Sequence, residues 1–118
     1  MCELARPMRV VYRTRTLEKA CNLQKDGDRL WGRQIAGKVR LRIEQIRGVD
    51  VLAELRLIPG ARFHQLTGDR LGQCAMDLTK NWRIIVEPWD ELRSEIIGGD
   101  VNEEDVRAVR IRDVEDYH

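Results

Sequence analysis

The chain has 118 residues, of which 42% are hydrophobic and 35% charged, so it has enough apolar material for one compact core and too little length for two independent domains. The longest purely apolar run, around Ile84 to Val86, is far too short to cross a bilayer, and charges throughout the first thirty residues exclude a secretory signal. We therefore expect a single domain over residues 1–118, soluble, cytoplasmic and without membrane contact.

Charge is unevenly distributed along the chain although the formal net charge is only +1. Residues 1–83 hold 17 Lys and Arg against 9 Asp and Glu, whereas residues 84–118 hold 4 against 11. A basic body attracts phosphate backbones. Ordinary soluble domains also show such asymmetry, so it favours a polyanionic partner only weakly.

The cysteines and histidines form no disulfide or metal pattern. Cys2, Cys21 and Cys74 are odd in number and widely spaced, and neither histidine has a second ligand at metal-binding distance in the sequence. The chain also has no glycine-rich phosphate loop and no heptad array. We expect reduced thiols, no metal site and no cofactor.

The N-terminal part is predicted to hold one strand and one helix. Residues 8–12 have the β-branched and aromatic content of a short strand. Thr14 or Thr16 then caps a helix that ends near Gly27. The cluster Asp26-Gly27-Asp28 predicts a break before the next helix.

A second helix is predicted over residues 28–47, since apolar residues recur there every three to four positions. The apolar stripe consists of Trp31, Ile35, Val39, Ile43 and Ile46. The opposite face is basic, which is typical of a solvated helix and also suits a binding surface. A further helical turn over residues 50–55 precedes a stop at Pro59-Gly60.

Beyond Pro59 the hydrophobic period changes to two, which indicates strands. The predicted strands cover residues 62–65, 73–78, 82–86 and 106–114. Turn residues separate the first three, which predicts an antiparallel meander. Helices followed by strands predict an α+β fold in which N-terminal helices pack on one face of a small antiparallel sheet.

An acidic segment at residues 87–105 separates the last two predicted strands. It has eight acidic residues against the single Arg93, together with Pro88 and a Gly98-Gly99 pair. We expect a long hairpin loop here, because it exceeds the length of a tight turn.

Proton-transfer groups occur in the meander and at the end of the chain. Asp116, Tyr117 and His118 directly follow the last predicted strand, where a free end can bend over a cleft. His64 lies on the first strand of the meander, and histidine exchanges protons near neutral pH. Acid and base groups on either side of a phosphate are the minimum for cleaving RNA. The alternative for each residue taken singly is that His64 is an ordinary surface residue and that Tyr117 and His118 belong to a disordered C-terminus.

Arg83 interrupts a strand that is otherwise built for burial. It lies between Trp82 and Ile84, so its side chain points to the opposite face of the sheet. A guanidinium fixed on a sheet face is suited to binding a phosphate through two hydrogen bonds. An ordinary surface arginine is the alternative.

Taken together, these motifs resemble the HigB branch of the RelE/ParE toxin superfamily. His64 is followed by Leu66-Thr67-Gly68-Asp69-Arg70, then by Asn81-Trp82-Arg83-Ile84, and finally by Asp116-Tyr117-His118. Leu17-Glu18-Lys19 after the first strand is similar to the opening of that family, so the resemblance spans nearly the whole chain. The acidic segment is similar to the one found in a subgroup of this family, whose members are labelled plasmid maintenance killer protein or killer suppression protein.

The resemblance implies a RelE-like fold and a metal-independent endoribonuclease that cuts messenger RNA in the ribosomal A site and so stops translation. It implies a helix-turn-helix antitoxin of the HigA type, through which operator DNA would be contacted. The implied catalytic residues are His64, Arg83, Asp116, Tyr117 and His118, and the implied RNA-binding residues are Arg62, Arg70, Lys80 and Asn81. Thr67 departs from the family, in which a lysine is usual, so one cation is missing.

Two other functions fit the same sequence. A sister toxin of the same fold would inhibit DNA gyrase, although the terminal residues would then have no chemical task. A non-enzymatic interaction module would use the acidic segment to bind a basic partner, and His64 would be incidental.

Overall fold

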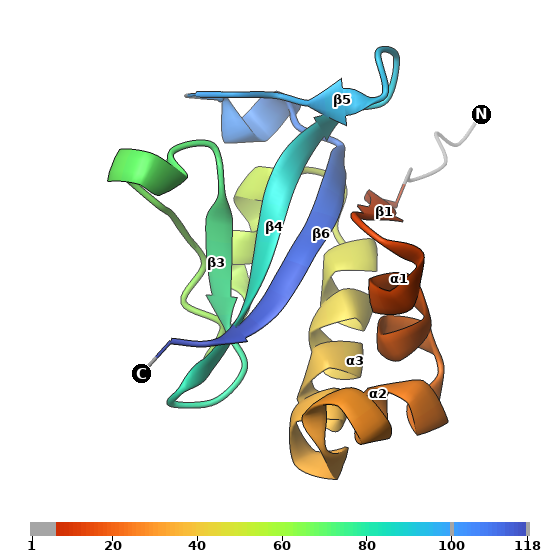
Figure 1. Cartoon of the computed structure of the whole chain (residues 1–118). Helices are drawn as coiled ribbons and strands as arrows, with labels where there is room; N and C mark the ends of the chain where they lie inside the picture. Colours follow the sequence, from red (N-terminus) through yellow and green to blue (C-terminus); the bar gives the residue numbers. More distant parts are fainter. Residues whose placement is uncertain (1–6, 100, 118) are drawn as a thin grey trace, which may run out of the picture.

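The computed structural model describes residues 7–99 and 101–117, and within these ranges it has the α+β architecture expected from the sequence (Figure 1). The helices are α1 (Arg15–Asn22), α2 (Gln24–Trp31) and α3 (Arg33–Arg47), with short 3-10 turns η1 (Leu52–Leu57), η2 (Gly68–Arg70) and η3 (Glu103–Asp105). The strands are β1 (Arg9–Tyr12), β2 (His64–Gln65), β3 (Cys74–Asp77), β4 (Trp82–Asp90), β5 (Glu95–Ile96) and β6 (Ala108–Asp116).

The strands form a sheet with the order β1-β6-β4-β3-β2, and β5 pairs with the far end of β4. The antiparallel meander β2-β3-β4 is confirmed. The last strand, β6, lies between β4, to which it is antiparallel, and β1, to which it is parallel. The sheet is therefore mixed, and the C-terminal strand is one of its central strands.

Helix α3 packs against one face of this sheet, and none of the helices α1 to α3 lies on the other face (Figure 1). The core joins Val39 and Ile43 of α3 to Met76, Ile84 and Val114 of the strands, all of which are buried. Because successive strand residues point to opposite faces, the residues that alternate with these core positions face away from the helices. We call this second side the open face, and it carries Asp77, Arg83 and Glu115.

The helix boundaries correct the sequence prediction. Thr14 caps α1, as predicted, by accepting a hydrogen bond from the Leu17 N–H at 3.0 Å. The predicted break at Gly27 is wrong, since this glycine lies buried inside α2. A Cβ atom there would lie 2.5 Å from the carbonyl oxygen of Ala20, so Gly27 allows α1 and α2 to pack closely. The break before α3 occurs at Gly32, whose φ of +83° favours glycine.

The acidic segment is more ordered than the loop expected over residues 87–105. Strand β4 continues to Asp90 and pairs with β5. The η3 turn is attached to the body, because the Glu103 carboxylate accepts hydrogen bonds from Arg56 at 2.7 and 2.8 Å and from Gln65 at 2.6 Å. The described helices include none with the length and apolar character that crossing a bilayer requires.

Candidate active site

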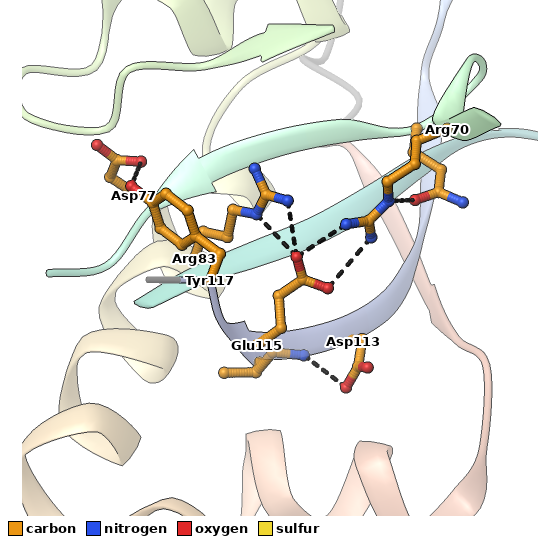
Figure 2. A network of polar contacts seen from close by, with 8 residues as sticks. Arg70, Asp77, Arg83, Asp113, Glu115 and Tyr117 are labelled. Carbon is orange, nitrogen blue, oxygen red and sulfur yellow. Dashed lines mark hydrogen bonds and ion pairs between the residues drawn. The ribbon is translucent and has the colours of Figure 1, made fainter. Parts of the chain in front are cut away.

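Three charged residues occupy opposed positions of neighbouring strands on the open face (Figure 2). Asp77 of β3 is directly opposite Arg83 of β4, and Arg83 is directly opposite Glu115 of β6. Directly opposed residues share a face and lie close enough for their side chains to interact. The orientation of Arg83 away from the core therefore agrees with the strand alternation in the sequence.

Glu115 holds Arg83 on one edge. The Nε and Nη2 atoms of Arg83 both lie 2.8 Å from Oε2 of Glu115. The Arg83 side chain is only 15% exposed, so water screens this pair less than it screens an ordinary surface ion pair.

Arg70, the last residue of η2, binds the same carboxylate from the other side. Its Nη1 and Nη2 atoms donate to Oε2 and Oε1 of Glu115 at 2.9 and 3.1 Å, and its Nε donates to Gln73 at 2.9 Å. The hydrogen bonds from Arg70, and next those from Arg83, lower the pKa of Glu115 against the opposing effect of burial. Two guanidinium groups share one carboxylate, which leaves the cluster with a net charge of +1.

Tyr117 continues the pairing of β6 with β4 by one residue and places its ring over Arg83. The Arg83 guanidinium lies 4.5 Å from the centre of the Tyr117 ring, within the range of a cation–π contact. The Tyr117 backbone N–H donates to the Asn81 carbonyl at 2.9 Å, and its hydroxyl lies 3.4 Å from Oδ1 of Asp77. Figure 2 shows the ring between Asp77 and Arg83.

His64 lies on the same open face, on the neighbouring strand β2, and is level with Ile85 of β4 rather than with Arg83. It is opposite Ala75, which is opposite Ile85, two residues from Arg83 on β4. The Nδ1 atom of His64 lies 2.7 Å from the carbonyl oxygen of Arg62. Because a carbonyl only accepts, we assign the hydrogen to Nδ1, which leaves Nε2 of the neutral ring as a proton acceptor.

Arg62 and Asp77 support this arrangement. Arg62 has a φ of +46°, a conformation uncommon for residues other than glycine, and its Nε donates to Oδ2 of Asp77 at 2.7 Å. The Asp77 carboxylate accepts hydrogen bonds from Arg62 and Tyr117, and it therefore connects the turn before His64 with the residue that follows β6.

The structure brings five of the predicted site residues to one region of the open face, namely His64, Arg83, Tyr117, Arg62 and Arg70. Asp116 is paired with Trp82, one position from the Arg83–Glu115 pair, so strand alternation directs it to the opposite face. Lys80 is exposed, and Asn81 contributes its backbone carbonyl. His118 lies outside the described residues.

Sequence reasoning missed Glu115, Asp77 and Gln73. Alternation from the buried Val109 and Ile111 would direct position 115 to the core, but the bulge at Arg112 reverses the alternation, so that Val114 is buried and Glu115 faces the open side. Nothing in the sequence indicates that Arg70 and Arg83 share its carboxylate, because that depends on the register of β4 against β6.

Metal and thiol chemistry have little support in the described part of the chain. Within residues 7–99 and 101–117, no three His, Cys, Asp or Glu side chains gather as a metal site requires. Burial raises the pKa of Cys21 and of Cys74 to about 12, so both side chains stay as thiols.

The chain shares its fold with a solved structure described as a YoeB/ParE toxin from Agrobacterium tumefaciens. The two superpose with a TM-score of 0.55 over 94% of this chain and 100% of the other, at 10% sequence identity. No protein-family model and no curated protein sequence matches this chain. At this identity the likeness establishes the fold alone.

Proposed function

We propose, from the fold shared with a toxin, that this protein is the toxin of a toxin-antitoxin pair and stops translation by cutting messenger RNA. The observation that carries the proposal is the packing of Tyr117 over Arg83, on the sheet face that also carries His64. Proton-transfer groups beside a fixed cation are what phosphodiester cleavage by an internal nucleophile requires.

In the proposed reaction the 2'-hydroxyl of the RNA attacks its own adjacent phosphorus. Nε2 of His64 accepts the hydroxyl proton, because the Arg62 carbonyl keeps the hydrogen of the neutral ring on Nδ1. The new bond joins phosphorus to O2', and the bond to O5' breaks. The leaving oxygen takes a proton from the C-terminal residues Tyr117 or His118. Asp116 has no step here, because strand alternation directs it to the opposite face.

Arg83 supplies the positive charge in this scheme. Glu115 occupies its Nε and Nη2 atoms on one edge, and its Nη1 points elsewhere and can donate to a phosphoryl oxygen. A preorganised donor of this kind accelerates such reactions roughly 10²- to 10³-fold.

RNA attraction is weaker in this scheme than a count of cations suggests. Asp77 pairs with Arg62, and Glu115 pairs with Arg70 and Arg83. The exposed Lys80, with the +1 charge of the cluster around Glu115, therefore carries much of the attraction to phosphate.

The partners in this proposal come from the family resemblance of the sequence. They are messenger RNA on the ribosome, a helix-turn-helix antitoxin similar to HigA, and operator DNA contacted through that antitoxin. The protein would act in the cytoplasm.

A cell-free translation assay run beside a DNA gyrase supercoiling assay tests the proposal. We expect the wild-type protein to cleave messenger RNA, and His64→Ala and Arg83→Ala to lose most of that cleavage. Tyr12→Phe is a control, because its hydroxyl contacts Asn22 and Arg47 near the helices, away from the site.

Two results would replace the proposal. Inhibition of gyrase with intact messenger RNA would identify a gyrase toxin. If deleting residues 117 and 118 leaves every activity unchanged, the protein is a non-enzymatic interaction module.

A further inference from the structure

Glu115 occupies the centre of the candidate site, yet the proposed reaction gives it no step. Its Oε2 atom accepts from Nε and Nη2 of Arg83 and from Nη1 of Arg70, and its Oε1 accepts from Nη2 of Arg70 (Figure 2). A carboxylate this well supplied with charged donors is stabilised as an anion. It is therefore a poor proton acceptor for a substrate hydroxyl.

The same contacts fix the orientation of Arg83. Glu115 holds one edge of its guanidinium and Tyr117 lies against its face, while Arg70 is fixed at Nε by Gln73. The carboxylate thus joins two cations that would otherwise repel each other. A cation that is already oriented needs no reorganisation when charge develops on a phosphate.

We propose that Glu115 is a positioning residue for RNA cleavage, which joins Arg70 and Arg83 into one oriented unit of charge +1. This role rests on the proposed function. The two arginines then have different roles. Arg83, which is 15% exposed and covered by Tyr117, stabilises the reacting phosphate. Arg70, on the η2 turn, contributes to attraction of the RNA.

This role predicts that a change at Glu115 affects RNA binding and the rate of cleavage in opposite directions. Removing the negative charge of Glu115 raises the summed charge of Glu115, Arg70 and Arg83 from +1 to +2, which strengthens the attraction for phosphate. The same change releases Arg83 from its fixed orientation, which slows the chemical step. A residue needed only for folding would not improve binding while slowing the reaction.

The test measures single-turnover cleavage of messenger RNA on ribosomes at increasing concentrations of protein. For Glu115→Gln we expect the saturating rate to fall about 10- to 100-fold. We expect the half-saturating concentration to stay the same or decrease. Glu115→Asp, which keeps the charge, should recover part of the rate.

Glu87→Gln is the matched control. Glu87 of β4 also has a carboxylate that two arginines share. Arg110 and Arg112 of β6 lie 2.8 and 3.3 Å from its oxygens. It is 2% exposed, so its loss should lower the melting temperature at least as much as Glu115→Gln does. It should leave the rate per folded molecule unchanged.

Arg70→Ala keeps the test decisive if Glu115→Gln does not fold. The Arg70 side chain is 35% exposed, and its removal leaves Glu115 paired with Arg83 alone. We expect the opposite separation, with a higher half-saturating concentration and a saturating rate that changes less than threefold.

The outcomes separate this inference from the proposed function. If the wild-type protein cleaves RNA and Glu115→Gln cleaves it at the same saturating rate, the positioning role is wrong. A proportional loss of binding and rate, or the same separation in Glu87→Gln, also overturns it. If the wild-type protein cleaves no RNA, the proposed function fails and the role of Glu115 fails with it.

Discussion

The Nδ1 atom of His64 lies 2.7 Å from the carbonyl oxygen of Arg62, a residue whose φ of +46° places it in the left-handed region. Such a conformation costs a side-chain-bearing residue about 1–2 kcal/mol. The ion pair between Arg62 and Asp77 offsets part of this cost. The strained turn thereby aims a carbonyl at the imidazole and decides which of its nitrogens carries the hydrogen.

Nuclear magnetic resonance tests this relationship directly. In the neutral imidazole of His64 we expect the hydrogen on Nδ1, which ¹⁵N chemical shifts distinguish from the more usual Nε2 form. Asp77→Ala removes the partner of Arg62, so the Nδ1–H form should become less populated and RNA cleavage should fall. A neutral His64 with its hydrogen on Nε2 in the wild-type protein would contradict the proton path.

Acid stability should depend on Glu103. The hydrogen bonds from Arg56 lower its pKa below the ordinary 4.5, against partial burial, and the bond from Gln65 lowers it further. Its stabilising contribution is therefore present above pH 4.5 and is lost as the pH falls through the lowered pKa. The melting temperatures of wild-type protein and Glu103→Gln, compared from pH 7 to pH 3, should converge at the acid end. A constant difference would show that the charge of Glu103 does not stabilise the fold.

Glycine substitutions should separate close packing from backbone conformation. Gly27→Ala places a Cβ atom 2.5 Å from the Ala20 carbonyl oxygen, and we expect a loss of about 2–3 kcal/mol in the free energy of unfolding. Gly32→Ala has open space but a φ of +83°, and should lose about 1–3 kcal/mol through backbone strain.

Gly37→Ala is the control for both glycine substitutions, because Gly37 lies within α3 and only the end of the Arg40 side chain approaches its Cβ position. This change should raise stability by about 0.5–1 kcal/mol. Denaturant unfolding measures all three free energies. Equal effects at the three positions would show that neither the contact nor the φ angle determines stability.

The two buried cysteines should resist alkylation. The thiols of Cys21 and Cys74 are buried, and their pKa values of about 12 leave almost no thiolate at pH 8. Peptide mass spectrometry after brief treatment with iodoacetamide should find both unmodified in the native protein and modified in denaturant. Rapid native modification of either would mean that the core around it opens readily.

The sequence predicted the fold class because its periods of 3.6 and two are strong signals. The sequence prediction misplaced the helix break at Gly27, because a glycine between two aspartates is equally compatible with a turn and with a close contact between helices. Only the packing of α2 against Ala20 distinguishes the two interpretations. The parallel pairing of β1 with β6 depends on contacts about a hundred residues apart, which local patterns do not contain.

The candidate site was predictable to the extent that one strand determines it. Alternation around Trp82 and Ile84 indicates the face on which Arg83 lies. The partner of Arg83 depends on the alignment of β4 with β6, and that register shifts between Ile85 and Val86. For this reason Glu115 emerged only from the structure.

The chemistry of the cut RNA end tests the central claim most directly. Wild-type protein, incubated with ribosomes and messenger RNA, should produce fragments with a 2',3'-cyclic phosphate and a 5'-hydroxyl, and His64→Ala should produce almost none. Fragments with a 3'-hydroxyl and a 5'-phosphate, or equal cleavage by His64→Ala, would contradict an attack by the 2'-hydroxyl at this site.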